Sequence, residues 1–109
     1  MKYNIVIHEN FIKEAKPLFK KFPSLKNDIK EIQDNIEKEL ILATDLGNGF
    51  KKINLKIKSK GKGSSGGGRI ITFETLIEIE KKEILFCSIY NKTDYDNIDI
   101  PILKEILGL

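Results

Sequence analysis

The sequence predicts an α+β domain in which helices cover one side of an antiparallel sheet. Apolar residues recur at helical spacing in the first half of the chain, whereas much of the second half alternates with the period of two typical of strands. The later strands follow one another without a helix between them, which favours hairpin pairing. The expected order of elements is β-α-α-β-β-β-α. Residues 1–109 show no internal repeat and have the length of one domain.

The first half is expected to supply one strand and a helical hairpin. Residues 3–7 alternate as a strand, and residues 10–22 carry an apolar stripe at helical spacing. Pro17 lies inside this stripe and predicts a kink or a restart, because proline removes a backbone donor. Ser24 is expected to cap a second helix over residues 25–40. The short connection between two amphipathic helices indicates a hairpin that packs on the sheet.

The second half is expected to supply three strands and a last helix. Residues 50–58 alternate between apolar and mostly basic side chains, and residues 69–80 and 83–90 are rich in β-branched and aromatic residues. A turn-rich link precedes the first of these strands, a glycine-rich loop follows it, and Lys81-Lys82 is the expected hairpin turn. After a polar loop, a proline suits the first turn of a helix over residues 102–107.

Positive charge is concentrated on the first of these strands and the loop after it. Seven basic residues and no acid lie between Leu46 and Phe73, although the whole chain carries a net charge of only +3. These residues are Lys51, Lys52, Lys56, Lys58, Lys60, Lys62 and Arg69. A concentrated cationic surface favours a polyanionic partner, and the glycines would let phosphates approach backbone N–H groups.

The end of the last strand extends this candidate site. Tyr90 and Lys92 lie where the strand opens into a polar loop, and we expect them to converge with Arg69 at one end of the sheet. A phosphodiester site needs cations that hold the phosphate and offset its transition-state charge. It also needs a group such as Tyr or Lys for proton transfer.

Other classes of site are not supported by the sequence. His8 is the only histidine, so a ribonuclease that works with two histidines is excluded. Residues with metal-ligand spacing are missing, and no metal or other cofactor is expected. Gly61, Gly63 and Gly66 spell a dinucleotide fingerprint, but a strand rather than a helix follows them. The single Cys87 allows no internal disulfide, which fits a reducing, cytoplasmic compartment, and no apolar run reaches the length of a membrane span.

A recognisable pattern runs through FKKINLKIKSKGKGSSGGGRIITF (residues 50–73) and ILFCSIYNKTDYDNI (residues 84–98). It combines a K-I-x-L strand, a basic glycine loop that ends in arginine, and an IYxK strand end. In these features, and in the helical segment over residues 11–29, the chain resembles the RelE/ParE toxin superfamily, in the RelE/HigB-like branch of type II toxin–antitoxin systems. The resemblance implies a RelE-like fold and a ribosome-dependent endoribonuclease that cuts translated mRNA by metal-independent attack of a ribose 2′-OH. It also implies a cognate antitoxin, mRNA on the ribosome and ribosomal RNA as partners.

The resemblance assigns roles to residues by position. Arg69 is expected to hold the scissile phosphate, and Tyr90, Lys92 and Lys58 are expected to complete the catalytic group. Contacts with RNA or the ribosome are implied for the remaining lysines of the strand and loop. These are Lys51, Lys52, Lys56, Lys60 and Lys62.

Two alternatives stay open. One is a ParE-like inhibitor of DNA gyrase that has no catalytic activity. The other is a catalytically weakened relative that binds only RNA or an antitoxin. The second is suggested by Asn54, which stands where this branch often has a cation. Ile98 lies near the place of a catalytic tyrosine in some relatives, and Tyr95 is only an approximate substitute.

Overall fold

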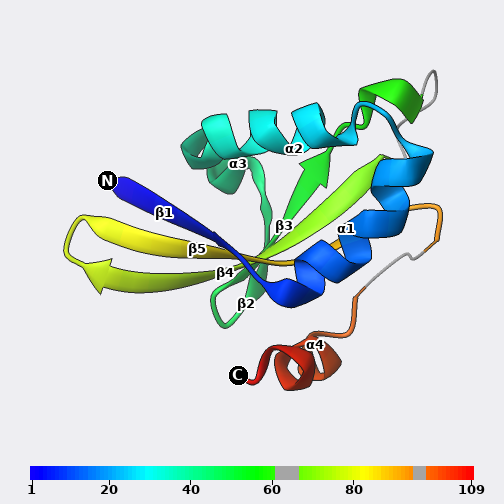
Figure 1. The fold of residues 1–109 in the computed structure, drawn as a ribbon. Helices are drawn as coiled ribbons and strands as arrows, with labels where there is room; N and C mark the ends of the chain where they lie inside the picture. Colours follow the sequence, from blue (N-terminus) through cyan, green and yellow to red (C-terminus); the bar gives the residue numbers. More distant parts are fainter. Residues whose placement is uncertain (61–66, 95–97) are drawn as a thin grey trace.

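The computed structural model describes residues 1–60, 67–94 and 98–109, and it confirms the α+β class. In the described ranges, one five-stranded sheet has the order β1-β5-β4-β3-β2 (Figure 1). The elements along the chain are β1 (Lys2–Ile7), α1 (Glu9–Lys21), α2 (Leu25–Asp34), α3 (Ile36–Leu42), β2 (Thr44–Gly47), β3 (Phe50–Leu55), the 3₁₀ turn η1 (Lys58–Lys60), β4 (Gly68–Glu78), β5 (Lys81–Asn91) and α4 (Ile100–Leu107). Among the helices described, none is long and apolar enough to cross a membrane.

The sheet is mixed, so the prediction of a purely antiparallel sheet is wrong. β1 runs parallel to β5, with Ile5 opposite Ile84 and Ile7 opposite Phe86. The strands β5, β4, β3 and β2 pair antiparallel with their neighbours. The hairpin argument applies only to strands that are adjacent in the sequence. β1 is remote from its partner along the chain, and its register is set by apolar residues that share the buried face.

The link before β3 contains a strand that was not predicted. In β2, Thr44 lies opposite Lys52 of β3. Asn48 and Gly49 join the two strands with φ values of 54° and 87°, the two successive positive values that a type I′ hairpin turn requires. β2 is short, and its only partly buried residue is Leu46, so it lacks the alternation by which a strand is recognised.

The helical pair differs in detail from its prediction. α1 continues through the exposed Pro17, so the expected restart does not occur. The second helix ends at Asn35, whose φ of −115° and ψ of 29° lie outside the helical region, and α3 begins after it. Ser24 does not act as a side-chain cap, because its own backbone is helical and its Oγ donates to Asp28 Oδ2 at 2.6 Å.

The sheet carries an apolar core on each face. The larger core lies between the sheet and α1–α3, and includes Phe11, Ala15, Leu25, Ile29, Ile32, Ile53, Leu55, Ile70, Ile84 and Phe86. The smaller core lies beneath α4 and consists of Phe50, Ile71, Cys87, Tyr90 and Leu103 with partly buried neighbours. The expectation that helices lie on one side only is therefore wrong. Strands whose two faces are both apolar need a cover on each face.

The β4–β5 turn falls at Ile79 and Glu80, so the predicted turn at Lys81-Lys82 is wrong. Both lysines belong to β5, where Lys82 lies opposite Leu76. Lys82 also forms an ion pair with Glu74 of β4, with a distance of 3.3 Å between nitrogen and oxygen. This cross-strand pair helps to explain why the lysines extend the ladder.

Candidate nucleic-acid interface

Three strands meet at one end of the sheet and bring two candidate residues and a neighbour into one row. Arg69 of β4 lies directly opposite Asn54 of β3 on one side and Tyr90 of β5 on the other. Residues directly opposite each other in an antiparallel pair project from the same face. Because Tyr90 belongs to the core beneath α4, Arg69 and Asn54 also lie on the α4 face. The structure thus brings Arg69 and Tyr90 together as predicted and adds Asn54 to them.

Arg69 is held close to the start of β4. Its side chain is partly buried, and Nη1 donates to the Gly68 carbonyl oxygen at 2.9 Å. A Cβ atom at position 68 would meet Leu55 Cδ2 at 3.2 Å and Ile57 Cδ1 at 3.3 Å. Glycine therefore lets β4 pass close to the core at the residue before the arginine. A planar guanidinium held in this way suits bidentate contact with a phosphate.

Tyr90 supplies a neutral phenol beside this cation. Its side chain is only 4% exposed, and burial raises its pKa above the ordinary value, while the guanidinium of Arg69 partly opposes that rise. The tyrosine is therefore protonated at neutral pH. A neutral phenol can donate a proton or a hydrogen bond, but it is a poor general base.

Two lysines lie at the same end of the sheet. Lys60 of η1 donates from Nζ to Asn91 Oδ1 at 2.7 Å, which ties the basic turn to the end of β5. Lys92 follows β5, is exposed, and donates its backbone N–H to the carbonyl oxygen of Gly67 at 3.1 Å. With Arg69, these residues place three cations around the meeting point of β3, β4 and β5.

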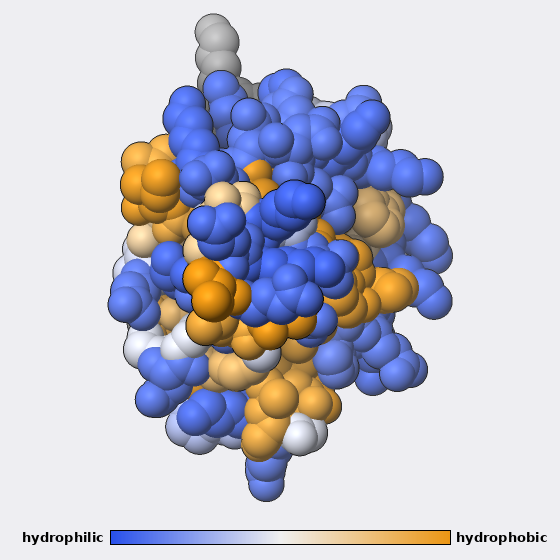
Figure 2. Space-filling model, turned by 90° about the vertical axis from the view of Figure 1, so that its left-hand side faces the viewer, coloured by the Kyte–Doolittle hydropathy of each residue, from blue (hydrophilic) through white to orange (hydrophobic). Residues whose placement is uncertain are grey.

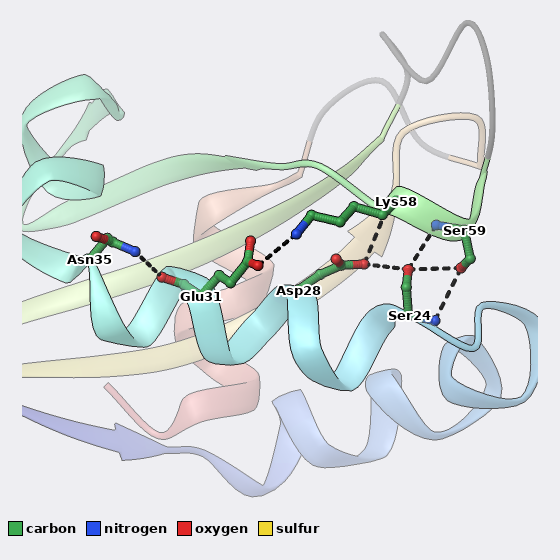
Figure 3. A network of polar contacts seen from close by, with 6 residues as sticks. All are labelled: Ser24, Asp28, Glu31, Asn35, Lys58 and Ser59. Atoms are coloured by element: carbon green, nitrogen blue, oxygen red, sulfur yellow. Dashed lines mark hydrogen bonds and ion pairs between the residues drawn. The ribbon is translucent and has the colours of Figure 1, made fainter.

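Lys58 points elsewhere, toward α2 (Figure 3). Its Nζ lies 2.6 Å from Glu31 Oε1, and the hydrogen bond and the charge of Glu31 raise the lysine pKa. A second contact fixes the same turn, because the buried Asp28 carboxylate accepts from Ser24 Oγ at 2.6 Å and from the Lys58 N–H at 3.2 Å (Figure 3). Lys58 is therefore engaged with a helix and is not grouped with Arg69 and Tyr90.

The remaining lysines are divided between surfaces. Lys51 reaches the Leu40 carbonyl oxygen of α3 at 3.4 Å. Lys52 alternates with it along β3, so it faces the α4 side, and it is partly buried. Lys56 follows β3 and is exposed. The prediction for Lys62 falls outside the described residues. Within the described part of the chain, the basic residues around β3 therefore do not form one continuous patch.

Two cavities adjoin Tyr90 and reveal residues that were not predicted. The first, of about 350 Å³, lies between α1, β5 and α4, and the second, of about 240 Å³, lies between α1 and the end of β5. Glu14 and Tyr90 line both cavities. Glu14 Oε1 accepts from Ser88 Oγ at 2.6 Å and from Asn10 Nδ2 at 2.9 Å. The only sequence signal was the spacing of four residues between Asn10 and Glu14, which places them on one face of α1.

Other features of the region bear on the predicted roles. Ile98 is partly buried against the core beneath α4, and the possible substitute Tyr95 lies outside the described residues. Across residues 1–60, 67–94 and 98–109, no group of three or more His, Cys, Asp or Glu side chains is arranged to hold a metal ion. No family model matches the chain, and no curated protein matches it.

Proposed function

We propose that the protein is the toxin of a type II toxin–antitoxin system and acts as a ribosome-dependent mRNA endoribonuclease. The observation that carries the proposal is the row formed by Asn54, Arg69 and Tyr90, with Lys60 and Lys92 at the adjoining strand ends. This arrangement offers cations for a phosphate and a neutral acid beside them. The resemblance of the chain to the RelE/HigB-like branch supplies the substrate, which is mRNA in translation.

Arg69 has the central role in this proposal. Its guanidinium would bind the scissile phosphate through two hydrogen bonds and stabilise the charge that grows on the phosphorus-bound oxygens in the transition state. Lys92 would add a second charge from the exposed side. The nearby Lys60 would contact the RNA backbone beside the cut.

The proposed reaction is a transfer within the RNA. The ribose 2′-oxygen attacks the adjacent phosphorus, the bond from phosphorus to the 5′-oxygen breaks, and a 2′,3′-cyclic phosphate and a 5′-hydroxyl form. One proton leaves the 2′-hydroxyl for water, and one reaches the 5′-oxygen. Tyr90 is neutral because of its burial and suits donation to the departing 5′-oxygen once RNA binding exposes its hydroxyl, which is buried in the free protein.

The test is to map cuts in one defined mRNA in a reconstituted translation system. We expect the protein to produce new 5′ ends only inside the translated region and only when ribosomes are present. Arg69→Ala should slow cleavage at least about a hundredfold, the usual loss when one transition-state donor is removed. Lys16→Ala, an exposed lysine of α1, is the matched control and should cleave normally. Intact mRNA with the wild-type protein would refute the proposal.

A specific observation favours one alternative, an RNA-binding protein with weak or no cleavage. Asn54 supplies no charge beside Arg69, and Lys58 is engaged by Glu31. Such a protein would bind ribosomes with an affinity that falls steeply with salt, because cations contact phosphates, and would leave the message intact. A ParE-like gyrase inhibitor would instead block supercoiling by purified gyrase without affecting mRNA.

A further inference from the structure

The far end of β4 is open on one side. Its first residues, Gly68 to Phe73, pair with β3, and Glu74 still donates its N–H to the Gly49 carbonyl oxygen at 2.9 Å. Beyond Glu74, the ladder partners of β4 within the described residues belong to β5 alone. We call residues 75–80 the β4 arm. It projects past β2 and β3 at the left of Figure 1.

The β4 arm is apolar as well as open. Leu76, Ile77 and Ile79 are 63%, 45% and 90% exposed. Figure 2 views the molecule from the side to which the β4–β5 turn points and shows orange apolar surface among blue polar surface. The edge strand β1, on the far side of β5, turns Lys2 and Asn4 to solvent, as protected edge strands do. On the β4 arm the exposed Leu76 is apolar instead, and a β-bulge between Leu76 and Glu78 limits the regular open edge to the residues before it.

The direction of the backbone groups in the arm follows from the last hydrogen bond that β4 makes before it, from Glu74 to Gly49. Along a strand, successive residues direct their N–H and C=O groups to opposite sides. Glu74 directs its N–H toward β3, so Leu76 directs its own backbone groups to the same side, where no strand of the described chain covers them. An added strand would find a donor and an acceptor at Leu76.

We infer that the β4 arm binds an extended segment of a partner protein that alternates apolar and basic residues. The apolar side chains would cover Leu76 and Ile77, and the backbone would continue the sheet. The basic residues follow from the charges present. Glu78 lies opposite Lys81 in the ladder, but neither it nor Glu80 forms an ion pair among the described residues, whereas Glu74 is already paired with Lys82.

A second copy of this chain fits the arm poorly. Two identical antiparallel strands are related by a two-fold axis, so pairing centred on Leu76 would place Glu74 opposite Glu78 twice. Pairing centred on Ile77 would place Glu74 opposite Glu80. Like charges directly opposite each other destabilise a sheet, and pairing centred earlier would collide with β3. A basic segment meets none of these obstacles.

The inference goes beyond the proposed function and concerns a separate surface. Arg69 and Leu76 lie about 23 Å apart along β4, at ~3.3 Å per residue. A partner on the arm would therefore leave the row around Arg69 accessible. RNA cleavage and occupation of the arm can be measured independently.

The experiment measures binding of a short fluorescein-labelled peptide that alternates Val and Lys. We expect binding to the full-length protein, with amide chemical-shift changes centred on Leu76. A Val/Glu peptide should bind much more weakly. A Val/Lys peptide methylated on alternate backbone nitrogens keeps its charge but cannot extend the sheet. Its affinity should be lower by a factor of about five or more, because it lacks the edge hydrogen bonds.

Variants of the protein separate edge pairing from simple charge attraction. Leu76→Pro removes the outward N–H and should weaken peptide binding about fivefold, and Glu78→Lys should weaken it by charge reversal. Ile41→Lys, at a position of α3 that is even more exposed than Leu76, is the control and should bind normally. If Leu76→Pro does not fold, Leu76→Lys takes its place. Equal binding of the methylated peptide, shifts centred elsewhere, or a dimer in light scattering that Leu76→Pro dissolves would overturn the inference.

Discussion

The two ends of β4 have similar sequences and opposite environments. At the first end, Ile70 and Ile71 are fully buried between β3, β5 and the two apolar cores. At the other end, Leu76 and Ile77 are exposed, as is Ile79 in the turn that follows. β-branched and apolar residues occur at both ends, so composition does not account for the difference. It arises because neighbouring elements cover only the first end.

This comparison separates two kinds of site. At the covered end, Arg69 has a strand on each side and a fixed direction, which suits a residue that must position a phosphate. At the open end, the backbone has unused bonding capacity, which suits recognition of a flexible chain. The predictions below test this division, from the largest expected effect to the smallest.

The largest effect should come from deleting a side chain at the covered end. Ile70→Ala removes part of a fully buried side chain and should lower the free energy of unfolding by about 2–5 kcal/mol. Ile77→Ala, on the open arm, should change it by about 0.5 kcal/mol or less. Urea unfolding of both variants measures the contrast. Equal losses would show that the arm is packed in solution.

The next effect concerns RNA cleavage. Arg69→Ala should reduce the cleavage rate by about a hundredfold to a thousandfold, and Arg69→Lys should recover part of the loss, because lysine keeps the charge but loses the planar fork. Glu78→Ala on the arm should leave cleavage unchanged. Rates from single-turnover assays on programmed ribosomes provide the measurement. A slow Glu78→Ala variant would show that the two ends of β4 do not act separately.

Alkaline pH should lower the stability of the fold through a buried thiol of the core beneath α4. Burial raises the pKa of Cys87 from 9.0 to about 12. The native state thus keeps its proton while the unfolded chain loses it, so stability falls as pH rises above 9.0 and is unaffected below. The slope from this thiol is at most about 1.4 kcal/mol per pH unit. Cys87→Ala should remove this part of the slope when unfolding is measured from about pH 8 to about pH 10. Tyr90→Phe should remove only the contribution that comes from the raised pKa of Tyr90.

The smallest effect should come from the exposed ion pair of η1. Asp28 is buried and accepts two hydrogen bonds, so Asp28→Ala should lower the free energy of unfolding by about 1–3 kcal/mol. Glu31→Ala breaks only its exposed contact with Lys58, and its thermal midpoint should be indistinguishable from wild type. A large loss for Glu31→Ala would mean that Lys58 is fixed more firmly than its exposure indicates.

Sequence patterns identified the elements that depend on local periodicity. The alternation of Ile53, Leu55 and Ile57 predicted β3 because each of these side chains meets the same apolar layer. The parallel pairing of β1 and the short strand β2 could not be predicted, because both depend on partners that local periodicity does not identify. The position of α4 was missed for the same reason, since its cover of Phe50 and Ile71 is a tertiary contact.

The candidate site also contains residues whose positions were predicted from the sequence and residues whose positions were not. The closeness of Arg69 and Tyr90 followed from strand pairing and was predicted. The direction of Lys58 was not, because Glu31 lies 27 residues earlier on a different element. Asn10 and Glu14 resemble the solvent-facing residues of an amphipathic helix, yet Asn10 Nδ2 donates to the Cys87 carbonyl oxygen at 3.0 Å, at a part of β5 that β1 does not reach. A helix that covers a strand edge has no distinctive pattern in the sequence.

The position of β5 between β1 and β4 has a consequence for synthesis of the chain. β1 is translated before β2, β3 and β4, but its partner β5 is translated after them, so β1 stays without a neighbour while those strands emerge. Pairing across such a long separation closes late, because loop-closure entropy opposes it. A nascent chain therefore completes its sheet only after β5, which carries Tyr90, has been made.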